Sequence, residues 1–154
     1  MIEEHLLELG IDLPLAPAPV ASYVPVRIAD AMAFVAGQIP MEEGRPMLTG
    51  AVDADVTVEQ AQEGARRCAL QALAALREAL GSLDRVLFIA QLTVYVASSP
   101  GFTQQPAVAN GASDVLVEIF GEEGRHARAA VGVAELPLGA SVEVVVTAVI
   151  ARTL

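Results

Sequence analysis

Two charged side chains in the C-terminal quarter of the chain have types and a spacing that could do chemistry. Arg128 opens an apolar stretch, RAAVGVAEL, whose next residues are mostly small and leave space around the guanidinium group. Glu143 is the only ionisable residue in the following stretch, SVEVVVTAVIA. A guanidinium group can hold a carboxylate through two parallel hydrogen bonds, and a glutamate can orient or activate a water molecule. The pair therefore suits the hydrolysis of a small substrate that carries a carboxylate.

An alternative is that Arg128 and Glu143 lie on the solvent-exposed face of an edge hairpin, where most charged residues of strands are found. A single acid in so apolar a strand, however, needs a partner, a water molecule or an interface. We therefore expect both residues to line a ligand site.

Other residues with reactive side chains lack the partners that their chemistry requires. Cys68 lies in a helical stretch, where a lone buried cysteine usually serves as a small apolar residue. His5 and His126 do not form a pair at zinc-ligand spacing, and the DAD motif at 53–55 precedes a helix cap, where acids are common. No histidine lies within a recognisable nucleophile motif around the serines that we considered, which are Ser22, Ser98, Ser99 and Ser113. We therefore expect no metal, no cofactor and no serine nucleophile.

Composition limits the classes of partner. The 154 residues, 54% of them hydrophobic, are enough for one globular unit with its own core. The net charge of −10 and the absence of lysine argue against a nucleic-acid partner and exclude a Schiff-base lysine. The apolar runs are too short to span a bilayer, the N-terminal residues include acids where a signal peptide has bases, and one cysteine cannot form an internal disulfide. We expect a cytoplasmic protein that does not insert into membranes.

The order of apolar and turn-forming residues predicts an α+β fold, β-β-α-β-α-β-β, in which a mixed sheet carries two helices on one face. The clearest helix covers 58–80, with Thr57 and Gln60 as a capping box. Residues 85–97 are apolar at nearly every position, as in a central strand covered on both faces. The remaining predictions are a helix at 2–9, a proline-rich arm to residue 20, a hairpin over 23–40, a loop or irregular helix start at 98–112, a helix at 113–120, and a final hairpin of 128–136 with 141–151.

Several motifs, taken in order, resemble the RidA/YjgF family of reactive-intermediate deaminases. The sequence AR that opens a strand is followed at family spacing by V, LP and VE, over residues 127–143. The segment AGQIP, residues 36–40, is similar to the family's SGQIP strand, and Tyr23 precedes Gly37 by fourteen residues, as in the family. The resemblance covers about residues 21–152, with residues 1–20 as an N-terminal extension found in one branch and 21–154 as the domain.

The resemblance implies a chorismate-mutase-like fold that assembles as a homotrimer, with a ligand site in each cleft between subunits. Such trimers hydrolyse short-lived enamine and imine acids, of the 2-aminoacrylate and 2-iminopropanoate kind, to 2-oxo acids and ammonia without a cofactor. Arg128 matches the arginine that holds the substrate carboxylate, and Glu143 matches the acid that positions water. Tyr23 and Gly37 would line the pocket.

Two departures from the family pattern bear on activity. Ala130 stands where well-known members have cysteine, and Ser113 is the nearest match to their pocket asparagine. These changes favour an alternative function, a trimeric module that binds a small carboxylate without turning it over. The endoribonuclease label that some members carry agrees least with this acidic chain, which has no lysine and few aromatic residues. We expect residues 1–20 to lie over the neighbouring subunit near the cleft.

Overall fold

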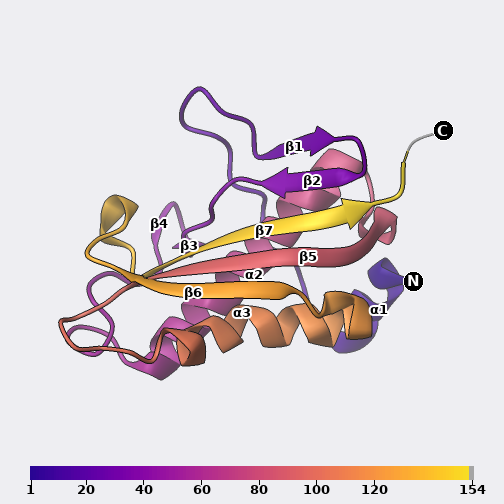
Figure 1. Ribbon diagram of the computed structural model, residues 1–154. Coiled ribbons are helices and arrows are strands. Elements are labelled where there is room, and N and C mark those ends of the chain that lie inside the picture. Colours follow the sequence, from indigo (N-terminus) through magenta and orange to yellow (C-terminus); the bar gives the residue numbers. More distant parts are fainter. Residues whose placement is uncertain (153–154) are drawn as a thin grey trace.

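The computed structural model describes residues 1–152, and the last two residues of the predicted domain lie outside this range. Its order of elements is the predicted one, with two short additional strands (Figure 1). The helices are α1 (Ile2–Leu9), α2 (Val58–Leu80) and α3 (Gln105–Phe120). The main strands are β1 (Val26–Ala29), β2 (Met32–Val35), β5 (Val86–Ala97), β6 (Ala127–Val133) and β7 (Val142–Ile150), and a small hairpin is formed by β3 (Met41–Glu42) and β4 (Arg45–Pro46).

The five main strands form one mixed sheet in the order β1-β2-β7-β5-β6, and α2 and α3 pack against one of its faces (Figure 1). β5 pairs with β6 in parallel and with β7 in antiparallel fashion, whereas β1, β2 and β7 are antiparallel to their neighbours. The core lies between the helices and this face of the sheet. The α+β fold and the interior place of β5 are confirmed.

The predicted final hairpin of 128–136 with 141–151 is wrong. β6 and β7 do not pair with each other, because β5 lies between them. The short connection, with a 3-10 turn at Pro137–Gly139, carries the chain across the end of β5 instead of folding it back onto β6. The order strand, helix, strand in β5-α3-β6 was the signal for this arrangement, because a helical crossover joins parallel strands.

Two further predictions need correction. α3 begins at Gln105, so it is longer than the predicted 113–120, and of the two alternatives for residues 98–112 the helix start holds from Gln105 on. Pro106 fits in the first turn, because the missing N–H of proline has no helical partner to lose there. β5 is not covered on both faces, since Phe88 and Gln91 are exposed on the face opposite the helices. In this single chain the helix-free face of the sheet is therefore open.

The capping of α2 is as predicted. The Thr57 hydroxyl accepts a hydrogen bond from the Gln60 N–H at 3.1 Å, the Gln60 side chain accepts one from the Thr57 N–H at 2.9 Å, and Gly81 ends the helix with a positive φ of 81°. These caps satisfy backbone groups that would otherwise lack partners. The apolar stripe of the helix faces the core, and its residues Ala65, Ala69, Leu73, Leu76 and Leu80 are all buried.

α2 and α3 approach so closely that Gly111 has no room for a side chain. A Cβ atom there would lie 2.1 Å from the Gln62 carbonyl oxygen, and the Gln62 side chain donates a hydrogen bond to the Ala107 carbonyl at 2.7 Å. We expect Gly111→Ala to lower the free energy of unfolding by about 1 to 3 kcal/mol, because a rigid backbone cannot yield to the added carbon. Chemical denaturation will measure this, with the exposed Asp114→Ala in the same helix as the control. Equal stability of the two variants would contradict this packing.

The N-terminal helix α1 is anchored on the domain. Leu6 is buried in the core, the Glu3 carboxylate accepts a hydrogen bond from the Leu83 N–H at 2.8 Å, and the Asp84 carboxylate accepts one from the Glu3 N–H at 3.1 Å. The chain then continues through the proline-rich arm toward β7, where residues 17–20 reach a pocket described below. Among residues 1–152, no helix is both long and apolar enough to cross a membrane.

Candidate functional site

The six site residues expected from the sequence fall into two groups in the structure. Tyr23, Gly37 and Glu143 line one pocket at the β7 side of the sheet. The other three, Ser113, Arg128 and Ala130, lie at the edge formed by β6 and α3. A single subunit therefore does not bring Arg128 and Glu143 together.

The register of the sheet explains this separation. Arg128 pairs with Leu92 of β5, and Glu143 pairs with Tyr95 of the same strand. Paired residues share a face of the sheet, and alternate residues along a strand point to opposite faces. Leu92 is fully buried beneath the helices, so Arg128 is on the helix side and Glu143 on the open side. The two residues are also about 10 Å apart along the strands and about 10 Å apart across them.

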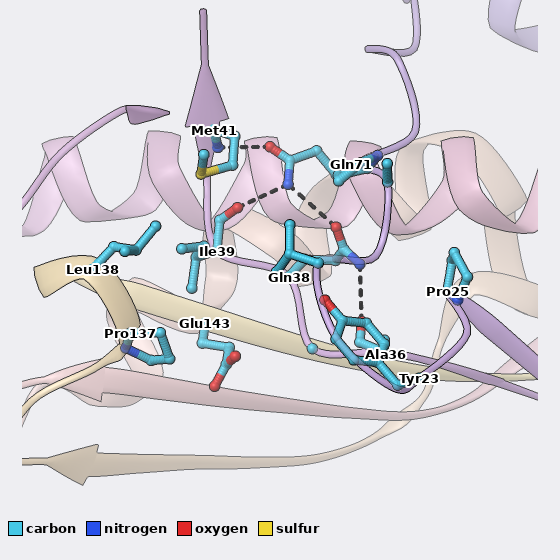
Figure 2. Close-up of a pocket in the computed structure, with 14 residues that line it drawn as sticks. Tyr23, Pro25, Ala36, Gln38, Ile39, Met41, Gln71, Pro137, Leu138 and Glu143 are labelled. Carbon is cyan, nitrogen blue, oxygen red and sulfur yellow. Dashed lines mark hydrogen bonds between the residues drawn. The ribbon is translucent and has the colours of Figure 1, made fainter. Parts of the chain in front are cut away.

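The pocket around Glu143 is a cavity of about 400 Å³ with largely apolar walls. Figure 2 shows Glu143, Tyr23 and Leu138 around it, with the β7 strand below and α2 behind. Its apolar and aromatic lining comes from three segments, the arm with the turn after it, the segment from the end of β2 to Met41, and the turn before β7. These residues are Pro17, Ala18, Val20, Tyr23, Pro25, Ala36, Ile39, Met41, Pro137 and Leu138. The proline-rich arm thus forms a wall of the pocket in its own subunit.

Glu143 is the one carboxylate of this pocket. It is half-buried, and burial raises the pKa of its carboxyl group above the ordinary value, because the charged form loses hydration. Within residues 1–152 this carboxylate accepts no hydrogen bond from a backbone or side-chain donor. Its oxygens are therefore available to a water molecule or a ligand.

Two buried glutamines hold the segment that faces Glu143. The Gln71 side chain donates to the Ile39 carbonyl at 2.8 Å and to the Gln38 side chain at 3.3 Å, and accepts from the Met41 N–H at 2.8 Å (Figure 2). Backbone hydrogen bonds of 2.8 and 2.9 Å join Gln38 to Val144 of β7. The Gln38 side chain also donates to the Ala36 carbonyl at 2.9 Å, so the chain is held on both sides of Gly37. Neither glutamine was predicted as a site residue, although a glutamine inside the alanine-rich buried part of α2 indicates a polar contact there.

Gly37 approaches Glu143 more closely than any other residue type could. A Cβ atom at this position would lie 2.8 Å from the Glu143 Oε1 atom. The clash is with the end of a flexible side chain, so the carboxylate can move away while the fold remains. We expect Gly37→Ala to keep its melting temperature within a few degrees but to lower the kcat of any reaction that uses Glu143 by about tenfold, since a displacement of about 1 Å is costly in an active site.

A double-mutant cycle with Glu143→Gln tests this prediction. If Gly37→Ala acts by displacing the carboxylate, it will have little further effect in a chain that already carries Glu143→Gln, because contacting residues are not additive. Full additivity of the two losses would mean that the added methyl group acts on something else.

The second group is built around Arg128. Its Nη1 donates hydrogen bonds to the Asn110 side-chain oxygen at 2.8 Å and to the Ser113 hydroxyl at 3.2 Å. These residues are three apart on α3 and so lie on one side of the helix. Within residues 1–152 neither Nε nor Nη2 has an acceptor, so this edge of the guanidinium group is open to a planar carboxylate. Asn110 was not among the predicted residues, because the family's asparagine was aligned with Ser113, one turn later.

Ser113 also contacts a histidine, which the sequence analysis did not anticipate. The distance between the Ser113 Oγ and His126 Nε2 atoms is 2.9 Å, and His126 Nδ1 lies 2.7 Å from the Gly124 carbonyl oxygen. Burial and the Arg128 cation lower the pKa of His126, against the opposing effect of the hydrogen bond to Gly124. Short sequence motifs do not show this contact, because Ser113 and His126 are thirteen residues apart in the chain. They lie side by side because α3 ends and the chain turns back. Ala130 is two residues beyond Arg128 on the same face of β6 and packs against the core.

The remaining candidates have structural surroundings. Cys68 is fully buried, and burial raises the pKa of its thiol well above the ordinary value, which agrees with its expected part as a small apolar residue. The Asp55 carboxylate accepts a hydrogen bond from the Ala51 N–H at 2.8 Å within its own loop. In the part of the chain that the structure describes, no three His, Cys, Asp or Glu side chains gather closely enough to hold a metal ion.

Comparisons with known proteins agree with this architecture. The family model described as "YjgF/chorismate_mutase-like, putative endoribonuclease" matches residues 3–150, which includes most of the segment before residue 21. Protein TCP17 of Trypanosoma cruzi is 49% identical over 144 residues, which cover 93% of this chain and 90% of TCP17.

Two solved structures have nearly the same backbone. The protein Atu1372 of Agrobacterium tumefaciens matches with a TM-score of 0.89 at 45% identity, over 97% of this chain and 93% of Atu1372. A protein of Shewanella oneidensis MR-1, described as "a putative endoribonuclease", matches with a TM-score of 0.92 at 32% identity, over 97% and 99% of the two chains. Since the family model spans nearly the whole chain and these relatives match over almost their full length, the protein belongs to the YjgF family, the RidA/YjgF family that its AR, LP and VE motifs had indicated.

Proposed function

We propose that the protein hydrolyses reactive enamine and imine acids, of the 2-aminoacrylate and 2-iminopropanoate type, to 2-oxo acids and ammonia without a cofactor. The observation that carries this proposal is the pair of complementary groups described above. Arg128 has a guanidinium edge open to a carboxylate, and Glu143 has an unpaired carboxylate in a largely apolar pocket. Together they supply what hydrolysis of a small imino acid needs, a carboxylate anchor and a group that orients water.

The proposed site is completed between subunits of a homotrimer. Arg128 and Glu143 lie on opposite faces of one sheet, so a common ligand requires Arg128 of one subunit and Glu143 of its neighbour. The open face of the sheet supports such an assembly, because it exposes large apolar side chains, which soluble proteins usually cover. These are Phe34 with 46% of its surface exposed, Phe88 with 40% and Val131 with 41%.

The proposed reaction adds water across the C=N bond. An enamine such as 2-aminoacrylate first takes a proton at its CH₂ carbon and becomes the imine. Glu143 accepts a hydrogen bond from water and directs its oxygen at the imine carbon, while Arg128 holds the carboxylate. The tetrahedral carbinolamine then loses the C–N bond, and the nitrogen leaves as ammonia. One imine and one water give one 2-oxo acid and one ammonia, so the reaction consumes no oxidant or reductant.

The residues ascribed to substrate binding divide in the same way. Tyr23 and Gly37 border the water-orienting group, while Ser113 and Ala130 border the carboxylate anchor. Ala130 supports a second candidate function, because a methyl group replaces the thiol expected from the family pattern. This is the capture of a small carboxylate by the same trimer without turnover.

One experiment separates the two functions. Imino acids are generated continuously from alanine, leucine and methionine by an amino acid oxidase, and the rate of 2-oxo acid and ammonia release is followed with and without the protein. A rate that rises in proportion to protein concentration supports the deaminase. No acceleration with any side chain, together with calorimetric binding of a 2-oxo acid, supports the binding module. Light scattering in the same buffer measures the mass of the assembly, and a value other than three subunits would contradict the trimer.

A further inference from the structure

We propose that His126 and Ser113 are positioning residues, which with Asn110 orient the Arg128 guanidinium group so that its Nε and Nη2 edge faces the ligand carboxylate. This inference rests on the proposed role of Arg128, which is to bind the substrate carboxylate. It concerns groups that do not themselves contact the substrate.

With a neutral His126 ring, the donors and acceptors fit one consistent chain of hydrogen bonds. The Gly124 carbonyl can only accept, so at 2.7 Å it takes the proton of His126 Nδ1. The neutral ring then has a lone pair on Nε2, which accepts the Ser113 hydroxyl proton at 2.9 Å. The Ser113 oxygen has lone pairs left for the Arg128 Nη1 donor at 3.2 Å. Each contact therefore determines the orientation of the next, from the backbone to the guanidinium group.

The first member of this chain is rigid. Gly124 is buried, and a Cβ atom there would lie 2.3 Å from the Leu116 carbonyl oxygen, so the turn after α3 packs directly against the backbone of that helix. The carbonyl that orients His126 is thus fixed relative to the helix that carries Ser113 and Asn110. The neutral state of the ring is favoured by the same surroundings, because burial and the neighbouring Arg128 cation both disfavour a second proton.

Arg128 needs such support because it is an exposed residue on an edge strand. A free arginine side chain samples many rotamers, and binding a ligand with one of them loses that freedom. Two acceptors from one side of α3 hold Nη1, which leaves the other edge of the planar group in a defined direction. A guanidinium group held in this way is preorganised for a bidentate contact with a carboxylate.

The test uses two replacements at each position. His126→Phe keeps a planar ring without an acceptor, whereas His126→Gln restores a side-chain acceptor. Ser113→Ala removes the hydroxyl, whereas Ser113→Thr retains it. The matched controls are His5→Gln and Ser99→Ala, whose side chains contact Glu118 and Val52 away from this edge. Pyruvate, a 2-oxo acid product, is the probe for calorimetric binding, and imino acid hydrolysis is measured in parallel.

We expect His126→Phe and Ser113→Ala each to weaken pyruvate binding by about tenfold, the effect expected for one lost hydrogen bond to a charged group. KM for the imino acid rises to a similar degree with a smaller change in kcat. His126→Gln and Ser113→Thr recover most of the affinity, and both controls bind as the wild type does. Melting temperatures identify any variant that fails to fold. If His126→Phe or Ser113→Ala does not fold, the affinities of His126→Gln and Ser113→Thr are used to test the inference.

A double-mutant cycle with Arg128→Lys distinguishes a positioning role of Ser113 from a general structural role. Lysine keeps the charge but has no planar fork to orient, so Ser113→Ala will have less than about a twofold further effect on pyruvate binding in this background. Equal losses in both backgrounds would overturn the inference, as would wild-type affinity in both His126→Phe and Ser113→Ala. If the wild type binds pyruvate but does not hydrolyse imines, the proposed reaction fails while the positioning inference is still decided by these affinities.

Discussion

Replacing Arg128 by alanine will lower kcat/KM for imino acids by about a hundredfold or more, because removal of one member of a hydrogen-bonded charge pair typically costs about 2 to 5 kcal/mol. Most of the loss will be a weaker binding of the carboxylate, seen as a higher KM and as weaker calorimetric binding of the 2-oxo acid product. Folding will be little affected, since Arg128 is exposed and, within residues 1–152, its side chain makes hydrogen bonds only to Asn110 and Ser113.

Two further variants make this expectation specific. Arg128→Lys retains the charge but not the fork, and we expect it to recover only part of the activity. Arg125→Ala removes another exposed arginine, which pairs with Glu122 outside the site, and we expect it to behave as the wild type. If Arg125→Ala loses as much activity as Arg128→Ala, the effect reflects net charge and not a carboxylate contact.

The fold could be predicted from the sequence where local patterns determine structure. The N-terminus of α2 is marked by the capping box of Thr57 and Gln60. Its C-terminus is marked by Gly81, whose positive φ is typical of a helix end. The pairing of β6 could not be read in this way. A short turn between two apolar runs predicts a hairpin locally, but β5 offers two edges, and the helical crossover through α3 decides that β6 takes one of them.

The residues of the candidate site could be predicted from the sequence only in part. Motif spacing identified Arg128 and Glu143, since a charged residue in an apolar strand is unusual at any place in the fold. It did not identify Asn110 and His126, because their importance depends on how α3 turns back toward β6. Spacing did not show that β5 lies between the two residues, and the register along β5 places their side chains on opposite faces of the sheet.

Replacing Glu143 by glutamine will lower kcat for imino acids by about a hundredfold or more while KM changes by less than about threefold, because glutamine fills the same space but its amide is a far weaker base than the carboxylate. The pocket and the carboxylate anchor therefore remain. A loss confined to kcat is the pattern expected for a group that acts only in the transition state. The control is Glu135→Gln, an exposed glutamate in the connection between β6 and β7.

The pH dependence of kcat/KM in the wild type will also reflect the ionisation of Glu143. Burial raises the pKa of Glu143, so the ionised form that orients water becomes dominant only at a pH above the range of an ordinary glutamate. We therefore expect kcat/KM to rise with pH through this raised pKa, and the rise to be absent in Glu143→Gln. A rise that persists unchanged in the variant would assign it to another group.

Stability will change in the opposite direction, which distinguishes a catalytic carboxylate from a structural one. A group whose pKa is higher in the folded state contributes most stability below its unfolded pKa and loses this contribution as the pH rises through its folded pKa. The ionised Glu143 therefore weakens the fold at neutral pH, and Glu143→Gln will be as stable as the wild type or more stable there. Denaturation followed from an acidic pH, below the range of an ordinary glutamate, to a higher, neutral pH measures this, and the advantage of the variant should appear only as the pH rises through the raised pKa. A variant that is both inactive and less stable at the higher pH would mean that Glu143 supports the fold and not the reaction.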